Sequence, residues 1–548
     1  MVQYEYPPPE NFCDGLNFAA VTLRPIRQAT VQLIDATSLA VLDSTVSDDS
    51  GNYSLAVNPQ TDVFVRVRAE LKNTSPVWDV EVRNNVVDPA EPNPPALADR
   101  PIYVMDGAVF NSGDQGQIQD LTAATGWDLS SSSFTEVRAA APFSVLDAIY
   151  SAMTLITTVD ASASFPPLDA FWSPDNVSAR GVGTFDEDIA SGEIGTSFYS
   201  GGRLFLLGKD GDDIEEFDDH VIVHEWGHYF EDNFSRSDSI GGAHGVGDLL
   251  DMRVAFGEGF ATALSGMALN NRIYCDTKWF AGKLSGFEID IESEFAGTPG
   301  WFNEISVMKL IYDLWDTNVD IAADDSSIGF APIYDVMTGP QTTTPAFTSI
   351  FSFATELKNV SGQDAFIDAL LGAANVTMAG LDIYGSTEVN KPPPPPDNSN
   401  DVLPVYTDLV LGNTINICTN SNNDLVRDGN KLSEHRFLKL NLPVSQQVTF
   451  SMITVSPPSM PAPGYDCVQA FIDGDPEVHD HSDPDFYVYL NGSLMWVGGS
   501  CEPNSEVSPT NGALPAGDYV IDLNEFRHED EDSPGGFPEQ VCFDFTAN

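Results

Sequence analysis

Basic residues are scarce in this 548-residue chain. Only 24 lysines and arginines stand against 82 aspartates and glutamates, which gives a formal net charge of −58. A surface with this excess of negative charge repels nucleic acid and anionic lipid, so neither is expected as a partner. It also keeps a protein soluble in saline surroundings. We therefore interpret most of the acidic residues as solvated and consider calcium binding only for a few loops.

Long hydrophobic runs are also missing. No stretch approaches the ~18 consecutive apolar residues of a membrane helix, so no membrane span is expected. The N-terminal sequence MVQYEYPPPENFCDG lacks the basic and apolar regions of a signal peptide. The chain is therefore either cytosolic or has lost a targeting segment. Apolar residues still make up 42% of the chain, enough for several packed domains.

Cysteine is sparse but clustered. Two of the six cysteines, Cys13 and Cys275, lie far apart and could pair with each other or stay free. The other four fall in the C-terminal quarter: Cys418, Cys467, Cys501 and Cys542. An even number in a β-rich segment predicts two disulfides, whose pairing the sequence does not determine. Disulfides favour a secreted or cell-surface protein whose targeting segment was removed.

The clearest boundary is the segment KPPPPPDNSND, residues 391–401. Its five consecutive prolines predict a stiff spacer. Around it we predict an N-terminal segment (1–17), an all-β sandwich (18–95), an α+β domain (96–390) and a second all-β sandwich (402–548). Within the α+β domain, apolar spacing predicts helices around 139–155, 218–233, 251–268 and 303–316, and a strand at 203–208.

Each predicted sandwich contains stretches that match a known type of domain. The first contains "SDDSGNYSLAV" and "FVRVRA" and resembles the carboxypeptidase regulatory-like domain. The second contains "DPDFYVYLNG" and "LPAGDYVIDLNEF" and resembles the bacterial pre-peptidase C-terminal domain. These resemblances imply modules that assist folding, targeting or substrate docking beside a catalytic domain.

A five-residue motif, His-Glu-Trp-Gly-His at 224–228, carries the chemistry. On a helix, His224 and His228 project from the same face, so their imidazoles can converge on one metal ion. Glu225 lies beside them and can act as general base on a water held by that metal. The alternative is a pair of histidines satisfied on a helix face beside a solvated Glu225.

The third ligand must come from elsewhere. The metzincin extension fails, because Glu231 replaces its glycine and Phe234 its third histidine. Glu258 follows in AFGEGFATALSGMA, a predicted helix whose small residues allow close approach to the motif helix. His244, in a glycine-rich loop, is the second choice as third ligand. His220, one turn before His224, is interpreted as a capping or supporting residue.

H-E-x-x-H followed by G-E-G-F-A resembles the fungalysin and thermolysin-like zinc peptidases, which are gluzincins. The segment EISVMKLIYDLWD, residues 304–316, is similar to a fungalysin helix that follows the zinc helices. The resemblance implies a zincin-like α+β catalytic domain flanked by the two all-β sandwich domains. It also implies zinc bound by His224, His228 and Glu258, with Glu225 as base.

The chain departs from these families at two points. Where they have an aspartate that orients the first histidine, this chain has Thr262, so Asp248 and Asp251 become candidates for that role. No histidine motif for stabilising the oxyanion follows residue 244. Tyr312 is predicted to take that catalytic role, and Tyr334 is the second choice. Buried tyrosines on apolar helices nevertheless usually belong to the core.

The predicted function is that of a secreted zinc-dependent endopeptidase. A protein or peptide substrate would be cut by a zinc-bound water activated by Glu225, and the strand RLFLLG (203–208) could be an edge that pairs with it. One alternative is a non-catalytic cell-surface or adhesive protein on a peptidase-like scaffold. Another is a zinc hydrolase acting on non-peptide amides or glycoproteins.

Calcium is the second cofactor considered. The segments 209–219 and 473–485 concentrate carboxylates, the oxygen ligands that Ca²⁺ takes, but lack the spacing of an EF-hand loop. A solvated acidic loop is the favoured interpretation of each.

Overall fold

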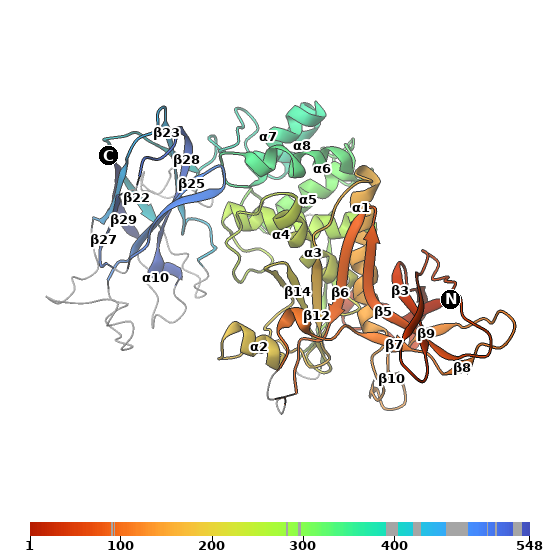
Figure 1. The fold of residues 1–548 in the computed structure, drawn as a ribbon. Coiled ribbons are helices and arrows are strands. Elements are labelled where there is room, and N and C mark those ends of the chain that lie inside the picture. The colour runs from red at the N-terminus through yellow and green to blue at the C-terminus, as the bar shows by residue number, and fades with distance from the viewer. Residues whose placement is uncertain are drawn as a thin grey trace. The chain divides into compact units, whose positions relative to one another are not determined.

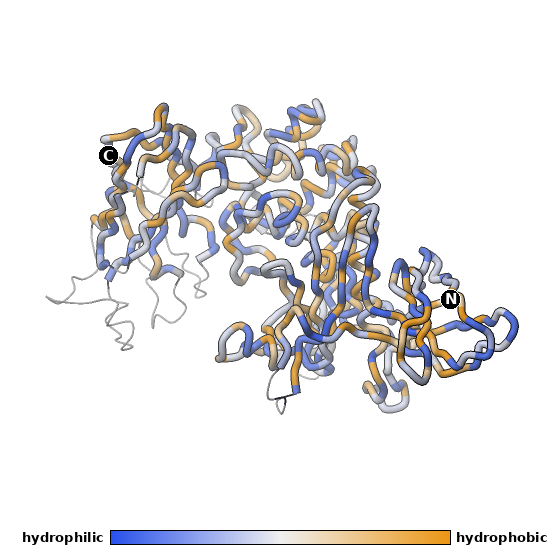
Figure 2. Tube along the Cα trace, viewed as in Figure 1, coloured by the Kyte–Doolittle hydropathy of each residue, from blue (hydrophilic) through white to orange (hydrophobic). Residues whose placement is uncertain are grey.

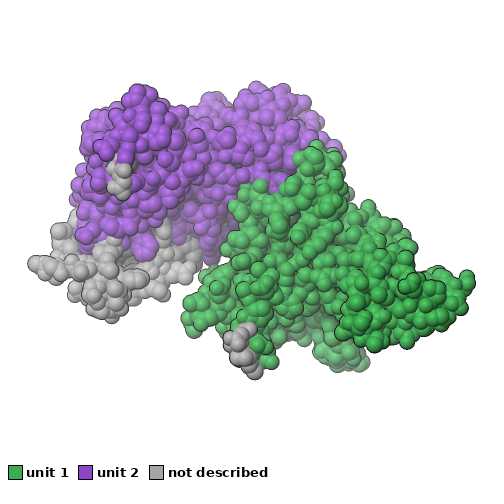
Figure 3. All heavy atoms as spheres, in the orientation of Figure 1, with its two compact units in different colours: residues 1–233, 261–293 green, residues 234–260, 294–548 purple. Residues whose placement is uncertain are grey.

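The computed structural model describes residues 1–88, 91, 94–280, 283–293, 297–390, 404–419, 429–455, 481–500, 502–509, 512–529 and 540–548. The predicted proline-rich linker, 391–401, lies outside the described residues, as does most of the acidic segment 473–485. The chain divides into two compact units, coloured separately in Figure 3. Unit 1 contains Met1–Asn233 and Ala261–Ser293; unit 2 contains Phe234–Phe260 and Glu294–Asn548.

All four predicted helical stretches are helical in the structure. They correspond to α1 (Ala141–Val159), α3 (Asp219–Phe234), α4 (Met252–Leu269) and α5 (Glu304–Trp315). The other helices described are α2 (Phe185–Ser191), α6 (Phe330–Thr338), α7 (Ile350–Ser361), α8 (Asp364–Ala373) and the short α10 (Phe526–Glu529). Single 3-10 turns form η1 (Asn11–Cys13), η2 (Phe18–Ala20), η3 (Leu97–Asp99) and η4 (Pro340–Thr343).

Unit 1 is built on a nine-stranded mixed sheet (Figure 1). Its main path runs β13 (Phe198–Ser200), β14 (Arg203–Leu206), β12 (Leu168–Trp172), β6 (Val77–Arg83), β5 (Asp62–Thr74), β3 (Ala29–Asp35) and β4 (Val41–Val46). The short strands β7 (Val104–Asp106) and β8 (Phe110–Asn111) also pair with β5. Strand β12 is parallel to both its neighbours, whereas β5 is antiparallel to β3 and β6. In Figure 2 these strands contain both hydrophobic and hydrophilic residues, as expected for a sheet that buries one face more than the other.

The sheet continues past residue 95, where the sequence predicts that a separate sandwich ends. Strands β3 to β6 come from the predicted sandwich, whereas β12, β13 and β14 come from the segment predicted as the α+β domain. The physical reason is the parallel pairing of β6 with β12, which joins the two segments into one sheet. Alternating apolar residues identify a strand but do not show which sheet it enters.

Helix α1 covers part of this sheet. It packs against β5 and β6 and buries residues such as Phe143, Leu146 and Ile149. By length and composition alone α1 is apolar enough to cross a membrane, although the sequence predicts no such segment. Because 56% of the relevant window is buried within the protein, the helix is weak evidence for a membrane span and has the character of a core helix.

Smaller sheets complete unit 1. Strand β1 (Val2–Tyr6) pairs with β2 (Thr22–Pro25) and β9 (Leu121–Ala123). Four two-stranded sheets follow: β10 (Trp127–Asp128) with β11 (Ser133–Phe134), β15 (Gly208–Lys209) with β16 (Asp213–Ile214), β17 (Ile273–Asp276) with β20 (Phe287–Asp290), and β18 (Trp279–Phe280) with β19 (Lys283–Leu284). A disulfide between Cys13 and Cys275 ties η1 to β17.

Unit 2 contains the helices α5 to α8 and, after residue 404, two sheets around a common core. One sheet has the order β21 (Tyr406–Leu409), β23 (Arg436–Leu442), β28 (Gly517–Glu525), β25 (Pro484–Leu490) and β26 (Ser493–Gly498). The other has the order β22 (Thr414–Thr419), β29 (Val541–Ala547), β24 (Thr449–Thr454) and β27 (Ser505–Pro509). Leu438, Phe450, Val488 and Phe545, from both sheets, belong to one buried cluster. This arrangement is that of a β-sandwich, here called the C-terminal sandwich.

A second disulfide, Cys418–Cys542, joins β22 to β29 within the C-terminal sandwich. The other two cysteines predicted to pair, Cys467 and Cys501, lie outside the described residues. Two disulfides in one chain fit an oxidising compartment.

Candidate metal centre

Small residues let helix α3, which carries the motif, pack closely against α4. A side-chain carbon on Gly227 would lie 2.8 Å from the Cα of Ala261, so only glycine fits at this crossing. Trp226 and Phe230 of α3 are both fully buried and anchor this helix in the core. Helix α4 continues without interruption from unit 2 into unit 1, and Glu258 lies about one turn before Ala261 on it. The glycine of the motif therefore brings the two helices close enough for their side chains to meet.

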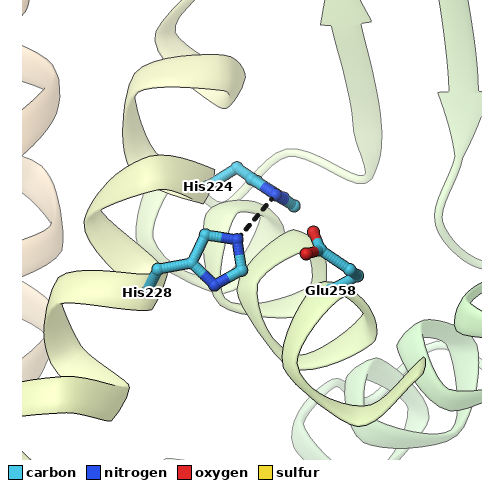
Figure 4. Close-up of side chains that lie close together, drawn as sticks. All are labelled: His224, His228 and Glu258. Carbon is cyan, nitrogen blue, oxygen red and sulfur yellow. Dashed lines mark hydrogen bonds between the residues drawn. The ribbon is translucent and has the colours of Figure 1, made fainter. Parts of the chain in front are cut away.

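His224, His228 and Glu258 form one group. Each offers a ligand atom, and these atoms all lie within 4.8 Å of one another. The Nε2 atoms of the two histidines are 3.2 Å apart, and Figure 4 shows both imidazoles directed toward the carboxylate of Glu258. Two nitrogens at about 2.0–2.1 Å from a tetrahedral zinc would be about 3.3–3.4 Å apart. The donor set and its spacing thus fit a zinc ion.

The other ring nitrogen of each histidine is held by a neighbouring side chain. Nδ1 of His224 lies 2.9 Å from Oγ1 of Thr262 on α4, and Nδ1 of His228 lies 3.3 Å from Oε2 of Glu231. An imidazole that donates from Nδ1 leaves Nε2 unprotonated as a ligand. Thr262, which replaces an aspartate of the resembled families, therefore occupies the orienting position itself.

The two aspartates predicted for that orienting role are engaged elsewhere, so this prediction is wrong. Asp251 binds the guanidinium of Arg253, with 2.9 Å between Oδ1 and Nε. Asp248 forms an ion pair with Lys431 at 3.3 Å. The sequence offered no sign that a threonine could substitute for the aspartate.

His244, the second choice as third ligand, lies beside Glu258 and outside the ligand group. Its Nε2 is 3.3 Å from Oε2 of Glu258, and its Nδ1 is 2.9 Å from Oε2 of Glu304. Burial lowers the pKa of His244, but the contacts with the two glutamates outweigh burial and raise this pKa to about 10. His244 thus links the carboxylate of Glu258 on α4 to the first turn of α5.

His220 has a supporting place, as predicted. Its side chain is buried, and Nδ1 lies 3.1 Å from Oγ of Ser265 on α4. Burial lowers the pKa of His220 to about 3, so the ring is neutral at ordinary pH. The contact adds a second polar link between α3 and α4, one turn before the ligands.

The predicted base, Glu225, is buried on α3, with 9% of its surface exposed. Its charge acts on Tyr274, whose ring centre is 6.3 Å from that of His224. Burial raises the pKa of Tyr274 well above its ordinary value, and nearby carboxylates including Glu225 raise it further. No motif in the sequence points to Tyr274, which lies in the short strand β17.

The two tyrosines considered for the oxyanion both lie in helices of unit 2. Tyr312 is buried in α5, with its ring centre 5.3 Å from that of Trp315. Tyr334 is buried in α6, against Phe330. The role of Tyr312 stays a prediction.

The acidic segment before α3 contributes to a second candidate metal group. Asp213 and Glu215 join Asp276 of β17, and their ligand atoms lie within 4.8 Å of one another. Burial raises the pKa of all three carboxyls, that of Asp276 to about 7. Lys278 binds one oxygen of Asp213 at 2.9 Å, while Oδ1 of Asp213 and Oδ1 of Asp276 are buried without a hydrogen-bond partner. Three carboxyl groups therefore lie together near one ammonium, that of Lys278.

A third group contains Asp313, near the end of α5, and Asp320 and Asp324, which follow this helix. Burial raises the pKa of Asp313 to about 8. Lys309 pairs with Asp320, and its Nζ lies 3.9 Å from Asp313. Because Asp320 is exposed, we propose no metal for this group.

The strand predicted as a free edge for substrate is not an edge. Strand β14 pairs with β12 on one side and with β13 on the other. The short strand β13 occupies the outer position, so the prediction for residues 203–208 is wrong. A three-residue edge strand carries too little pattern to be recognised in a sequence.

Comparison with known proteins finds no matching family and no matching curated protein. Among solved structures, the chain is similar to the pre-peptidase C-terminal domain of a collagenase from Bacillus anthracis, with 7% identity over 26% of this chain and 94% of that chain and a TM-score of 0.16. It is also similar to CorA, a surface-associated copper-binding protein of Methylomicrobium album BG8 (10% identity, 26% and 96% covered, TM-score 0.17). A third similarity is to PliG of Aeromonas hydrophila, a periplasmic inhibitor of g-type lysozyme (11% identity, 26% and 96% covered, TM-score 0.14). Scores this low carry no argument about function.

Proposed function

We propose that the protein is a secreted zinc-dependent endopeptidase of the gluzincin type. The observation that carries this proposal is the group of His224, His228 and Glu258 on the packed helices α3 and α4. Two imidazoles and one carboxylate leave a fourth position open, which is the ligand set of a catalytic zinc site. The two disulfides support secretion.

A zinc ion bound here would polarise a substrate carbonyl and make water a better nucleophile. Thr262 and Glu231 hold the imidazoles in the tautomer and orientation that ligation needs. Glu225, next to His224 in the motif, accepts the proton of the attacking water and delivers it to the leaving amine. Tyr312 is the proposed donor to the developing oxyanion.

Calcium is the second proposed cofactor, at Asp213, Glu215 and Asp276. Two buried carboxylates, those of Asp213 and Glu215, and the partly buried carboxylate of Asp276 supply the oxygen ligands that Ca²⁺ takes. Unpartnered oxygens on Asp213 and Asp276 support the proposal, because buried acceptors without partners are costly. Calcium here would connect β16 and β17 and thereby fix the backbone that leads into α3.

The test compares Glu225→Gln with wild type and with Glu288→Gln, which changes an exposed glutamate on β20. Wild type and the control are expected to bind about one zinc per chain and to cleave casein or peptides in a chelator-sensitive way. Glu225→Gln should keep the zinc and lose at least about a hundredfold in rate, as expected for a missing general base. Wild-type protein that binds no zinc contradicts the proposal.

The same experiment separates two other functions. A protein that binds zinc but cleaves no peptide is expected if the fold serves as a non-catalytic surface or adhesive scaffold. A zinc hydrolase of non-peptide amides would cleave such a substrate in a chelator-sensitive way and leave peptides intact.

A further inference from the structure

Loop 429–435, here called the docking loop, precedes strand β23 of the C-terminal sandwich and contacts the segment that carries His244. The side-chain amide of Asn430 donates hydrogen bonds to the carbonyl oxygens of Gly241 (2.8 Å) and Ala243 (3.1 Å). The ammonium of Lys431 donates to the same Ala243 oxygen at 2.7 Å. Both donors therefore hold the backbone immediately before His244.

The docking loop also pairs with the backbone that leads into α4. Asp251 donates its amide hydrogen to the carbonyl of Asn430, and Leu432 donates to the carbonyl of Leu249, each at 2.8 Å. Leu250 and Lys431 form an antiparallel bridge. The docking loop thus supports the chain from residue 241 up to the helix that carries Glu258.

Farther along the chain, a buried ionic network joins the start of α4 to the C-terminal sandwich. Arg253, only 2% exposed, binds Asp251 and reaches Asp522 of β28 at 2.7 Å. His435 of the docking loop contacts the other oxygen of Asp522, also at 2.7 Å. Arg253 lies on α4 five residues before Glu258. An uncompensated charge at any of these buried positions would be costly, so the network holds α4 in one place.

The segment from Ser239 to Asp248 contains no helix or strand of its own. Gly241 and Gly242 have φ values of 65° and 94°, which belong to the left-handed region that glycine favours. His244 nevertheless keeps its place between Glu258 and Glu304. A glycine-rich loop that positions a side chain needs contacts from outside, and Asn430 and Lys431 supply them.

We infer that the C-terminal sandwich is a structural part of the candidate metal centre, and that Asn430 and Lys431 are positioning residues that act through His244 on Glu258. This inference rests on the proposed zinc site. It replaces the expectation that the sandwich is a separate module for folding, targeting or docking.

The first experiment measures zinc affinity by chelator competition in full-length wild type, Asn430→Ala and a matched control. The control is Asn441→Ala, which removes a side-chain amide on β23 that binds Asp518 and does not contact the segment 239–251. Residues that orient metal ligands typically contribute 10–100-fold to affinity. Asn430→Ala is expected to weaken zinc binding about tenfold, whereas Asn441→Ala should leave it unchanged.

The second experiment asks whether Asn430 acts through His244. In a His244→Ala background, Asn430→Ala is expected to change zinc affinity less than about twofold, because the ring it positions is gone. A purely structural role would give additive effects. Additive effects, or wild-type zinc affinity in Asn430→Ala, would overturn the inference.

Hydrogen exchange of the metal-free protein separates this inference from the proposed function. Asn430→Ala should speed amide exchange in residues 239–251, and Asn441→Ala should not. If exchange does not respond, the inference fails while the zinc proposal stands. If wild type binds no zinc, the proposed function fails, and the inference fails with it. Should Asn430→Ala not fold, Lys431→Met removes the ammonium that donates to the Ala243 carbonyl and is held to the same expected results.

Discussion

Thr262→Val tests the hydrogen bond that we propose orients His224, the first candidate zinc ligand. Valine has nearly the same shape as threonine but has no hydroxyl, so Nδ1 of His224 loses its partner at 2.9 Å. A partly buried donor left without an acceptor costs about 1–3 kcal/mol. In the metal-free protein the ring can move to reach another partner, but zinc fixes it. We therefore expect zinc affinity to fall about 5- to 150-fold, at about 1.4 kcal/mol per factor of ten.

The assay is chelator competition for zinc, followed by thermal unfolding to confirm that the variant is folded. Thr154→Val is the matched control, because the Thr154 hydroxyl lies on α1 and donates only to the carbonyl of Tyr150. Thr262→Asp should retain or strengthen zinc binding, since a carboxylate is the stronger acceptor. An unchanged affinity in Thr262→Val would refute the assignment of Thr262 as the orienting residue.

Three further predictions concern packing and charge. Asp522→Asn removes the charge facing Arg253 and should lower the free energy of unfolding by about 3–5 kcal/mol, measured in urea. Burial raises the pKa of Asp522, but Arg253 and His435 together outweigh burial and lower this pKa from 3.8 to about 2. About 2 kcal/mol of stability should therefore be present above pH 4 and lost as the pH falls to 2, a loss that Asp522→Asn should not show. Gly227→Ala places a carbon 2.8 Å from Cα of Ala261, so it should lower the free energy of unfolding by about 1–3 kcal/mol and weaken zinc binding. The control Gly116→Ala adds a carbon that meets nothing within 4 Å, so it should change neither quantity.

The candidate ligands could be predicted because they depend on local spacing. His224 and His228 share a helix face at any position in a fold, and Glu258 follows on a helix whose small residues allow close packing. The structure confirms helices α3 and α4 near the predicted bounds. Local periodicity was sufficient for both.

The contacts around the ligands could not be predicted, because they join residues far apart in the chain. Asn430 lies almost two hundred positions after Gly241, and nothing in either segment indicates their contact. The pairing of β6 with β12 likewise joins strands separated by other elements. The contact between Thr262 and His224 could not be predicted for a different reason, because a hydroxyl can orient a histidine but is rarely expected to do so.

The most direct test of the zinc site is anomalous diffraction at the zinc edge from crystals of zinc-loaded protein. One peak is expected, about 2.0–2.2 Å from Nε2 of His224, Nε2 of His228 and a carboxylate oxygen of Glu258. No peak at this position, or a zinc ion bound without Glu258, would contradict the account.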